Sequence, residues 1–364
     1  MEPLRVKVYE LQEGCIVSAD VFSRTNRPVI GKNTVLTGQL INVLKAFLIK
    51  EIYVEKTMVN GMPFIPTESA AQGLAEEREV TGDLSFVDLF LRSKQHLKKE
   101  FVKWQSGAPI DIAKVRNILL PFLDSTETLA SHILNLHHYS TKDDYIYSHS
   151  LAVGIISGFI AKKMNYSKGD IIQIAIAGSL SDCGMAKLST KLLNKEASLT
   201  DDEYEEVKKH STYSYNMVKA SPLLKDGTKL AIVQHHERLD GSGYPFGEKD
   251  NRIHPFAKII AVSDIFHAMT SERPYKRKHS PFKVLEMILE DYFGKFDINA
   301  LKVISSAIMN FSIGSKVRLS NGQEAEVLFV EEKSPTRPLI KLLENEQIVH
   351  LSKNRQLFIE EVMH

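Results

Sequence analysis

The chain has 364 residues, 43% of them hydrophobic, which is enough for a substantial core and for more than one domain. Its 46 lysines and arginines nearly balance its 45 aspartates and glutamates, leaving a formal net charge of +1. This balance excludes bulk attraction to nucleic acid or to a membrane surface, so phosphate binding must be local. Two cysteines are too few for a disulfide framework. Neither a signal peptide nor a membrane span is predicted, so we expect a cytoplasmic protein.

The order of the predicted helices and strands along the chain indicates a mainly α, multidomain protein. Residues 1–59 predict a small α+β module, because short alternating apolar runs flank a helical run. Residues 60–82 are rich in glycine, proline and charge, which is typical of a linker. Residues 83–311 predict an all-α domain, with helices near 83–106, 110–138, 143–164, 168–181, 201–220, 228–236, 256–270 and 281–292. In residues 312–364 the apolar period becomes two around Asn321-Gly322, which predicts a small SH3-like β-barrel.

Imidazoles and carboxylates recur along the all-α region at His149, Asp182, His210, His235, His236 and Asp264. A hydrolytic metal centre needs neutral imidazoles and carboxylates that converge, with an aspartate able to bridge two cations. Side chains of adjacent helical residues diverge by about 100°, so His235 and His236 can serve one cluster only near a helix end. The polar, glycine-rich stretch ERLDGSGYP that follows them predicts such an end.

Six motifs in fixed order resemble the HD-GYP family: HSLAVG, LSDCG, EYEEVKKHSTYSYNMV, HHERLDGSGYP, FAKIIAVSDIFHAMTSERPYK and KFD. This family is a branch of the HD metal-dependent phosphohydrolases, and its members hydrolyse the bacterial second messenger cyclic di-GMP. The match has its motif core at residues 145–297. The flanking regions resemble the small N-terminal module and the C-terminal barrel of some Gram-positive members, which is a weaker similarity.

The resemblance implies a role for each matching residue. The six candidates above become ligands of one or two divalent ions, with iron or manganese expected, and Asp182 becomes the catalytic aspartate. Gly243, Tyr244 and Pro245 form a loop beside the site that supports its shape and partner recognition. Arg273 and Lys276 correspond to basic residues that meet the substrate phosphates, although a solvated basic loop is an alternative.

The chain departs from the family pattern at four positions. Ser181 replaces the dyad histidine and Met185 replaces a lysine, so a metal ligand and a cation near the scissile phosphate are both missing. Tyr145 replaces the glutamate of three-metal members, so a third metal ion is not predicted. His267 stands where many members have an aspartate. It either donates an imidazole to the metal or is hydrogen-bonded within the cluster without metal.

Two further residues near these positions, Cys183 and Asp144, are not expected to compensate. On a helix Cys183 points about 100° away from Asp182, and Asp144 is one residue away from the Tyr145 position.

The sequence leaves two functions open. One is a weak or degenerate phosphodiesterase that converts cyclic di-GMP to pGpG or GMP. The other is a catalytically inactive receptor or scaffold that binds cyclic di-GMP, or binds a signalling protein through the GYP loop. Nucleic-acid binding by the C-terminal strands is disfavoured, because their basic residues are interleaved with glutamates. A second copy of the chain is a candidate partner for the apolar helix 84–101, although core burial explains that pattern equally well.

Overall fold

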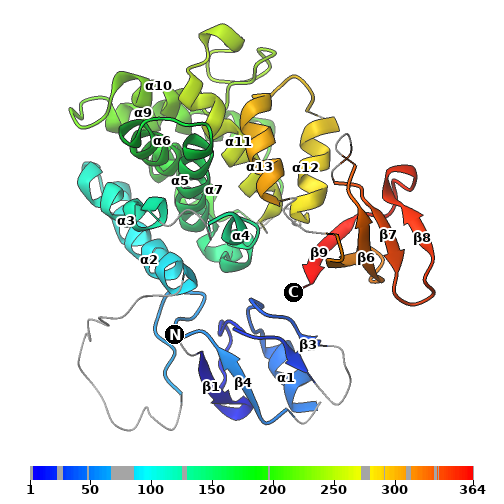
Figure 1. Cartoon of the computed structure of the whole chain (residues 1–364). Helices are drawn as coiled ribbons and strands as arrows, with labels where there is room; N and C mark the ends of the chain where they lie inside the picture. The colour runs from blue at the N-terminus through cyan, green and yellow to red at the C-terminus, as the bar shows by residue number, and fades with distance from the viewer. Residues whose placement is uncertain are drawn as a thin grey trace.

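The computed structural model describes residues 3–22, 28–46, 49–66, 86–124, 129–195, 197–271, 279–290, 292–308, 313–331, 334 and 336–363. Helices form the central body, with the N-terminal module below it and the C-terminal sheet beside it in the view of Figure 1. The predicted mainly α architecture with flanking strands is therefore confirmed. The expected boundaries between domains stay predictions, and most of the predicted linker lies outside the described residues.

The N-terminal module combines short antiparallel strand pairs with one helix. Strand β1 (Leu4–Lys7) runs through the 3-10 turn η1 (Val8–Glu10) and pairs with β4 (Glu51–Val54), while β2 (Val21–Phe22) pairs with β3 (Pro28–Ile30). Helix α1 (Gly38–Ala46) precedes β4. Apolar residues of these elements, among them Val6, Leu36, Leu44 and Val54, form a small core of their own.

The helical body begins with α2 (Phe86–Gln105), whose apolar side chains Phe90, Leu91, Leu97 and Trp104 are buried in the chain itself. The face that the sequence offers to a second copy is thus covered from within. The remaining helices are α3 (Ile112–Asp124), α4 (Leu129–Ile133), α5 (Tyr145–Lys163), α6 (Lys168–Leu180), α7 (Thr190–Leu193), α8 (Asp201–Lys208), α9 (His210–Val218), α10 (Asp226–Gln234), α11 (Pro255–Thr270), α12 (Pro281–Glu290) and α13 (Ile298–Ile308). Short 3-10 turns join several of them: η3 (Leu136–Tyr139), η4 (Lys142–Asp144), η5 (Cys183–Lys187) and η6 (Asp250–Arg252).

Helices α5, α6 and α11 lie at the centre and are apolar on nearly all sides, as fully surrounded helices must be. Glycines let α5 and α6 approach closely. A Cβ added to Gly154 would lie 2.9 Å from the Ala175 carbonyl oxygen, and one added to Gly178 would lie 2.9 Å from that of Val153. This packing fixes the two helices that lead to the candidate ligands His149 and Asp182.

The C-terminal region forms one five-stranded antiparallel sheet of order β8-β7-β6-β5-β9. Its strands are β5 (Lys316–Leu319), β6 (Glu324–Phe329), β7 (Leu339–Leu342), β8 (Ile348–His350) and β9 (Ile359–Met363), with η7 (Leu351–Lys353) after β8. The predicted hairpin at Asn321-Gly322 joins β5 to β6. The SH3-like barrel is not confirmed, because β8 and β9 stand at opposite edges of this sheet in the described residues.

Several helix predictions differ from the structure in detail. The helix predicted over residues 201–220 is two helices that meet at Lys209, and the segment 110–138 is divided into α3, α4 and η3. Helix α13 follows the last helix that the sequence predicted. Its residues Leu301, Ile304 and Ile308 recur at helical spacing and are buried in the main core.

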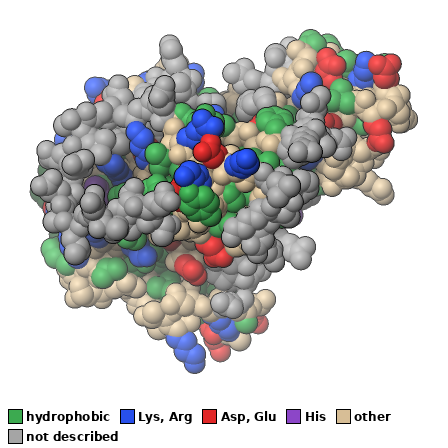
Figure 2. Space-filling view, turned by 90° about the horizontal axis from the view of Figure 1, so that it is seen from below, with side chains coloured by type: hydrophobic (Ala, Val, Ile, Leu, Met, Phe, Trp, Pro, Cys, Tyr) green, Lys and Arg blue, Asp and Glu red, His purple; other side chains and the backbone are tan. Residues whose placement is uncertain are grey.

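The described surface mixes both signs of charge. Figure 2 shows lysine and arginine side chains beside aspartate and glutamate side chains on the face seen from below. On the sheet, Arg318 pairs with Glu361 at 3.0 Å and Lys341 pairs with Glu346 at 3.3 Å. Among the described helices, none has the length and apolar character that crossing a bilayer requires.

Candidate metal centre

Asp182 is positioned by the break between α6 and η5. Helix α6 ends at Leu180, and Asp182 has φ −99° and ψ 7°, so the chain turns into η5 there. Ser214 of α9 holds this turn: its Oγ accepts from Gly184 N at 2.7 Å and donates to the Ser181 carbonyl at 2.6 Å. A Cβ on Gly184 would lie 2.1 Å from the His210 carbonyl oxygen, so glycine permits the approach that sets Asp182 beside His210.

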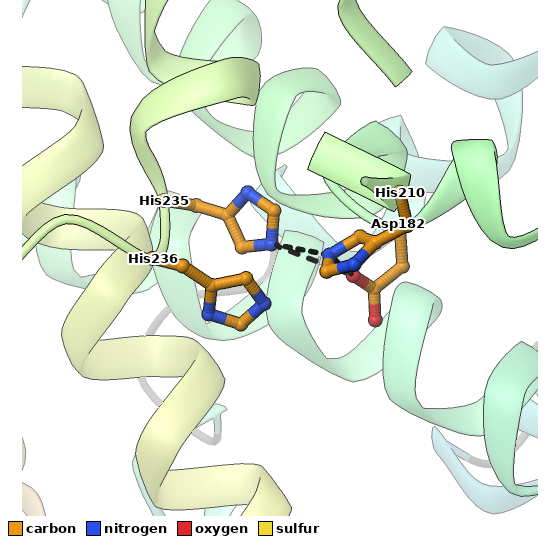
Figure 3. Close-up of side chains that lie close together, drawn as sticks. All are labelled: Asp182, His210, His235 and His236. Carbon is orange, nitrogen blue, oxygen red and sulfur yellow. Dashed lines mark hydrogen bonds and ion pairs between the residues drawn. The ribbon is translucent and has the colours of Figure 1, made fainter. Parts of the chain in front are cut away.

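The three histidines facing Asp182 come from helix ends. His210 opens α9, and His235 follows the last residue of α10, with His236 next. The predicted helix end at the histidine pair is confirmed, and their ring centroids are only 3.9 Å apart. Asp182, His210, His235 and His236 offer ligand atoms that all lie within 4.8 Å of one another. Figure 3 shows these four side chains close together.

Two backbone carbonyls fix which ring nitrogen faces the cluster. The Nδ1 of His210 lies 2.6 Å from the Val207 carbonyl oxygen, and the Nδ1 of His235 lies 2.8 Å from that of Ile232. A neutral imidazole has one proton, and a carbonyl holds it at Nδ1, so each Nε2 presents a lone pair. Carbonyls behind histidine ligands are a common support for metal coordination.

These lone pairs converge on one carboxylate oxygen. Asp182 Oδ1 lies 3.2 Å from His210 Nε2 and 3.5 Å from His235 Nε2, and the two nitrogens are 3.3 Å apart. Asp182 Oδ1 is buried and has no aligned hydrogen-bond partner among the described residues. Three acceptors around one point, with no proton to share in the neutral tautomers, repel one another unless a cation lies between them. The donor set of nitrogens and one carboxylate fits a divalent transition metal.

The other carboxylate oxygen faces a second half of the site. His149 Nε2 lies 3.5 Å from Asp182 Oδ2 and 3.0 Å from Asp264 Oδ1, and His236 Nδ1 lies 3.5 Å from Asp264 Oδ2. The structure therefore brings all six predicted residues together. Asp182 stands between the halves, which is the place that a bridging carboxylate requires.

Charge and burial act in opposite directions on the pKa values of Asp182, Asp264 and His210. Burial disfavours the ionised carboxyl of Asp182, yet His210 and His235 hold its pKa well below the usual range. Burial also opposes ionisation of Asp264, and His149 and His236 lower its pKa overall. For His236, burial and the neighbouring His235 hold the pKa well below the usual value, so its ring is neutral at pH 7. The His210 pKa is raised despite burial, because the Asp182 carboxylate favours the imidazolium, so a proton and a metal ion compete for this ring.

The residue at the dyad position contributes nothing to the cluster. Ser181 is buried, and its Oγ donates to the Gly178 carbonyl oxygen at 2.8 Å, back along α6. The Cys183 Sγ points to the Ser214 carbonyl oxygen at 3.9 Å, and Asp144 pairs with Lys94. Met185 packs against the main hydrophobic core. None of these four side chains supplies the missing imidazole or the missing cation.

His267 lies behind His149 and is hydrogen-bonded to it, as one of the two sequence alternatives expected. The two Nδ1 atoms are 3.0 Å apart, and the Tyr145 hydroxyl is 3.2 Å from the same His149 nitrogen. His267 is buried and donates no atom to the four-residue cluster. Sequence reasoning missed Tyr145 as a contact of His149, although its place one helical turn earlier is the signal that indicates it.

The GYP loop packs against the second histidine of the pair, His236. The Tyr244 ring lies 4.6 Å from the His236 ring, and a Cβ on Gly243 would lie 2.4 Å from the His236 carbonyl oxygen. The peptide bond between Tyr244 and Pro245 is cis. Glu237, which the sequence did not single out, is buried and accepts from Phe246 N at 2.7 Å and Glu248 N at 3.0 Å. Arg273 and Lys276 lie outside the described residues.

Comparison with known proteins identifies the same part of the chain. The model of the HD domain family matches residues 129–299. A cyclic di-GMP phosphodiesterase of Pseudomonas aeruginosa is 29% identical over 255 residues, which cover 69% of this chain and 60% of that protein. A cyclic di-GMP phosphodiesterase of Thermotoga maritima is 39% identical over 137 residues, covering 37% of each protein. A 3'3'-cGAMP-specific phosphodiesterase of Vibrio cholerae is 32% identical over 168 residues, covering 46% of this chain and 36% of that protein.

The matches thus span 60% or less of the length of these curated relatives. The residues matched by the HD domain model contain the six clustered side chains and the GYP loop. Residues 129–299 form an HD domain, and the chain belongs to the HD-GYP domain proteins.

Proposed function

We propose that the chain is an HD-GYP-type, metal-dependent phosphodiesterase that acts on cyclic di-GMP and yields pGpG or GMP. The observation that carries this proposal is the convergence of the His210 and His235 lone pairs on Asp182 Oδ1, because with neutral imidazoles a site built this way needs a cation. The printed names of the Pseudomonas and Thermotoga relatives support cyclic di-GMP as the substrate.

The chain's own residues have distinct roles in this proposal. Asp182, His210, His235 and His236 hold one divalent ion, and His149 and Asp264 share Asp182 to hold a second, with iron or manganese preferred. Such an ion supplies Lewis-acid activation of water and charge neutralisation at a phosphoryl group. Arg273 and Lys276 pair with the substrate phosphates, and the GYP loop closes one side of the site or recruits a protein partner. Hydrolysis adds one water molecule across a phosphodiester bond.

Turnover is expected to be weak. Loss of one ligand or of one cation at a phosphoryl-transfer site each costs on the order of a hundredfold in affinity or rate. Ser181 donates back to Gly178 and Met185 packs on the core, so neither position offers the group that the HD-GYP pattern has there.

The same observation at Ser181 favours a second candidate function. A receptor that binds cyclic di-GMP without cleaving it needs the retained ligands but not the missing ones. In that case the flanking units report nucleotide binding to a signalling partner in the cytoplasm.

One experiment separates the two functions. Protein purified with Mn²⁺ or Fe²⁺ under reducing, low-oxygen conditions is analysed for metal and then incubated with cyclic di-GMP, or with 3'3'-cGAMP, before chromatography of the products. Slow formation of a linear product that disappears in Asp182→Ala supports the enzyme. Cleavage only in Ser181→His/Met185→Lys, together with nucleotide binding by the wild type in calorimetry, supports the receptor. Failure of that double variant to bind metal contradicts both.

A further inference from the structure

A buried lysine joins three parts of the fold close to the metal centre. Lys94 of α2 is 1% exposed. Its ammonium donates to the Val59 carbonyl oxygen of the N-terminal module, to the Tyr139 carbonyl oxygen at 3.0 Å and to Asp144 Oδ2 at 2.7 Å. An ammonium has three donors, and each has an acceptor here. Burial lowers the Lys94 pKa and the Asp144 carboxylate opposes that shift, so the charge depends on its partners.

Asp144 carries this contact to the start of the helix that bears His149. It directly precedes α5, and its Oδ1 accepts from Thr141 N at 2.8 Å and from the Ser148 hydroxyl at 3.4 Å. Ser148 is the neighbour of His149. The carboxylate thus ties Lys94 to the first turn of α5, from which the imidazole reaches Asp182 and Asp264.

On its other side, Lys94 contacts the loop of residues 57–63, through which the N-terminal module packs against α2. Val59 N donates to the Gly14 carbonyl oxygen at 2.7 Å, and Thr57 and Pro63 form a bridge that closes the loop. At its tip, Gly61 has φ +81°, and a Cβ there would lie 2.7 Å from the Leu91 carbonyl oxygen. The loop therefore lies directly on the backbone of α2. If the loop moves away from α2, the buried Lys94 ammonium loses the Val59 carbonyl as an acceptor, and an unpaired donor in the core is unfavourable.

We propose that Lys94 is a positioning residue that couples the seating of the N-terminal module to the placement of His149 and so controls metal binding at the His149–Asp264 half of the site. The inference rests on the proposed metal-dependent function of this site and adds its regulation. A ligand or partner that lifts the Val59 loop from α2 weakens metal binding, and one that holds the loop down strengthens it. The cluster of Asp182, His210, His235 and His236 keeps its metal in both states, because its supports lie on other helices.

The test is a Mn²⁺ titration of the full chain by calorimetry, without nucleotide. Lys94→Met is expected to weaken Mn²⁺ binding at the His149–Asp264 half of the site by about tenfold to a hundredfold, the range typical of lost supporting contacts at metal sites. The control is Arg337→Met, because Arg337 also forms a buried ion pair, with Glu286, that joins the C-terminal sheet to α12. It is expected to lower the melting temperature and leave Mn²⁺ binding unchanged.

A second pair of variants keeps every charge in place and covers the case in which Lys94→Met fails to fold. Gly61→Ala is expected to lift the loop and weaken the same Mn²⁺ site at least severalfold. Its control is Gly107→Ala, since Gly107 also has a positive φ, of +94°, but nothing lies within 4 Å of an added Cβ. Wild-type Mn²⁺ affinity in Gly61→Ala, or equal weakening in Gly107→Ala, overturns the proposed coupling. A wild type that binds Mn²⁺ but leaves cyclic di-GMP intact contradicts hydrolysis only, and the titration still decides the coupling.

Discussion

At the residue scale, the proposed metal centre depends on which nitrogen of each histidine carries the proton. The carbonyls of Val207 and Ile232 set this for His210 and His235, and neither carbonyl can be recognised as a support from the sequence, because any residue supplies one. His267 illustrates the same limit. Its spacing from Asp264 left both metal binding and hydrogen bonding open, and the sequence does not predict its 3.0 Å contact with His149. Sequence motifs identify donors, but they do not fix the direction in which a donor points.

Burial of neutral His236 predicts a pH dependence of stability in the metal-free protein. The pKa of His236 is held well below its usual value of about 6.5, so below that pH the unfolded chain binds a proton that the folded chain does not. Stability from this residue is therefore complete above about pH 6.5 and is lost as the pH falls. With EDTA present, we expect roughly 1 kcal/mol of loss between pH 7 and pH 5.5.

The measurement is denaturant unfolding of the wild type and of His236→Asn at both pH values. The variant is expected to lose less stability on acidification, because the neutral amide has no proton to bind. His350→Asn, at an exposed strand residue, is the control and should follow the wild type. Identical pH dependence in His236→Asn and the wild type would contradict this explanation.

At the element scale, the sequence predicts most helices because their apolar periodicity is strong, and it fails where a side chain competes with the helix. The break between α8 and α9 falls where the Val207 carbonyl accepts from the His210 ring. A barrel was predicted for the C-terminal strands because alternation and a hairpin turn fit open and closed sheets equally. The pairing of edge strands decides that difference, and no local pattern encodes it.

Ser214 joins α9 to the turn between α6 and η5, and removal of its hydroxyl should lower both stability and metal affinity. In Ser214→Ala, Gly184 N and the Ser181 carbonyl lose their partner inside the core, which is expected to cost about 1–3 kcal/mol. Because these groups flank Asp182, metal affinity should also fall about tenfold. Ser211→Ala is a matched control: this serine is equally buried, but its hydroxyl donates only to the Lys208 carbonyl within its own turn. Chemical unfolding and Mn²⁺ titration test the pair, and equal effects would refute the link.

Glu237 holds the GYP loop by two backbone amides. Glu237→Gln replaces one acceptor oxygen with a donor group, so either Phe246 N or Glu248 N loses its partner, at a cost of about 1.5–3 kcal/mol. Hydrogen exchange of residues 244–248 should accelerate. Glu248→Gln removes a surface ion pair with Arg252 at 3.5 Å and should leave hydrogen exchange of the loop unchanged. Unaltered protection of the loop in Glu237→Gln would show that its backbone is held by other contacts.

At the scale of the whole molecule, two buried ion pairs lie where the flanking units contact the helical body. Lys94 and Asp144 serve the N-terminal module, whereas Arg337 and Glu286 serve the C-terminal sheet. The sequence identified neither pair, because isolated charges on amphipathic helices and strands are usually exposed. Only the packing of distant segments buries them. The N-terminal pair lies beside the proposed metal ligand His149 and the C-terminal pair does not, so only the N-terminal pair should affect metal binding.

This difference gives a last prediction, on the independence of the C-terminal sheet from the metal centre. Arg337 also donates to the carbonyls of Leu351, Asn354 and Leu357, so it holds the segment between β8 and β9 in place. Removing its counter-charge in Glu286→Gln should cost about 3 kcal/mol. Amide exchange should accelerate in β5–β9 and α12, while α5, α6 and Mn²⁺ affinity stay as in the wild type. Glu361→Gln, which breaks only the exposed pair with Arg318, should change little. Loss of protection in α5 in Glu286→Gln would mean that the sheet and the metal centre form one cooperative unit, in which the C-terminal pair also supports the site.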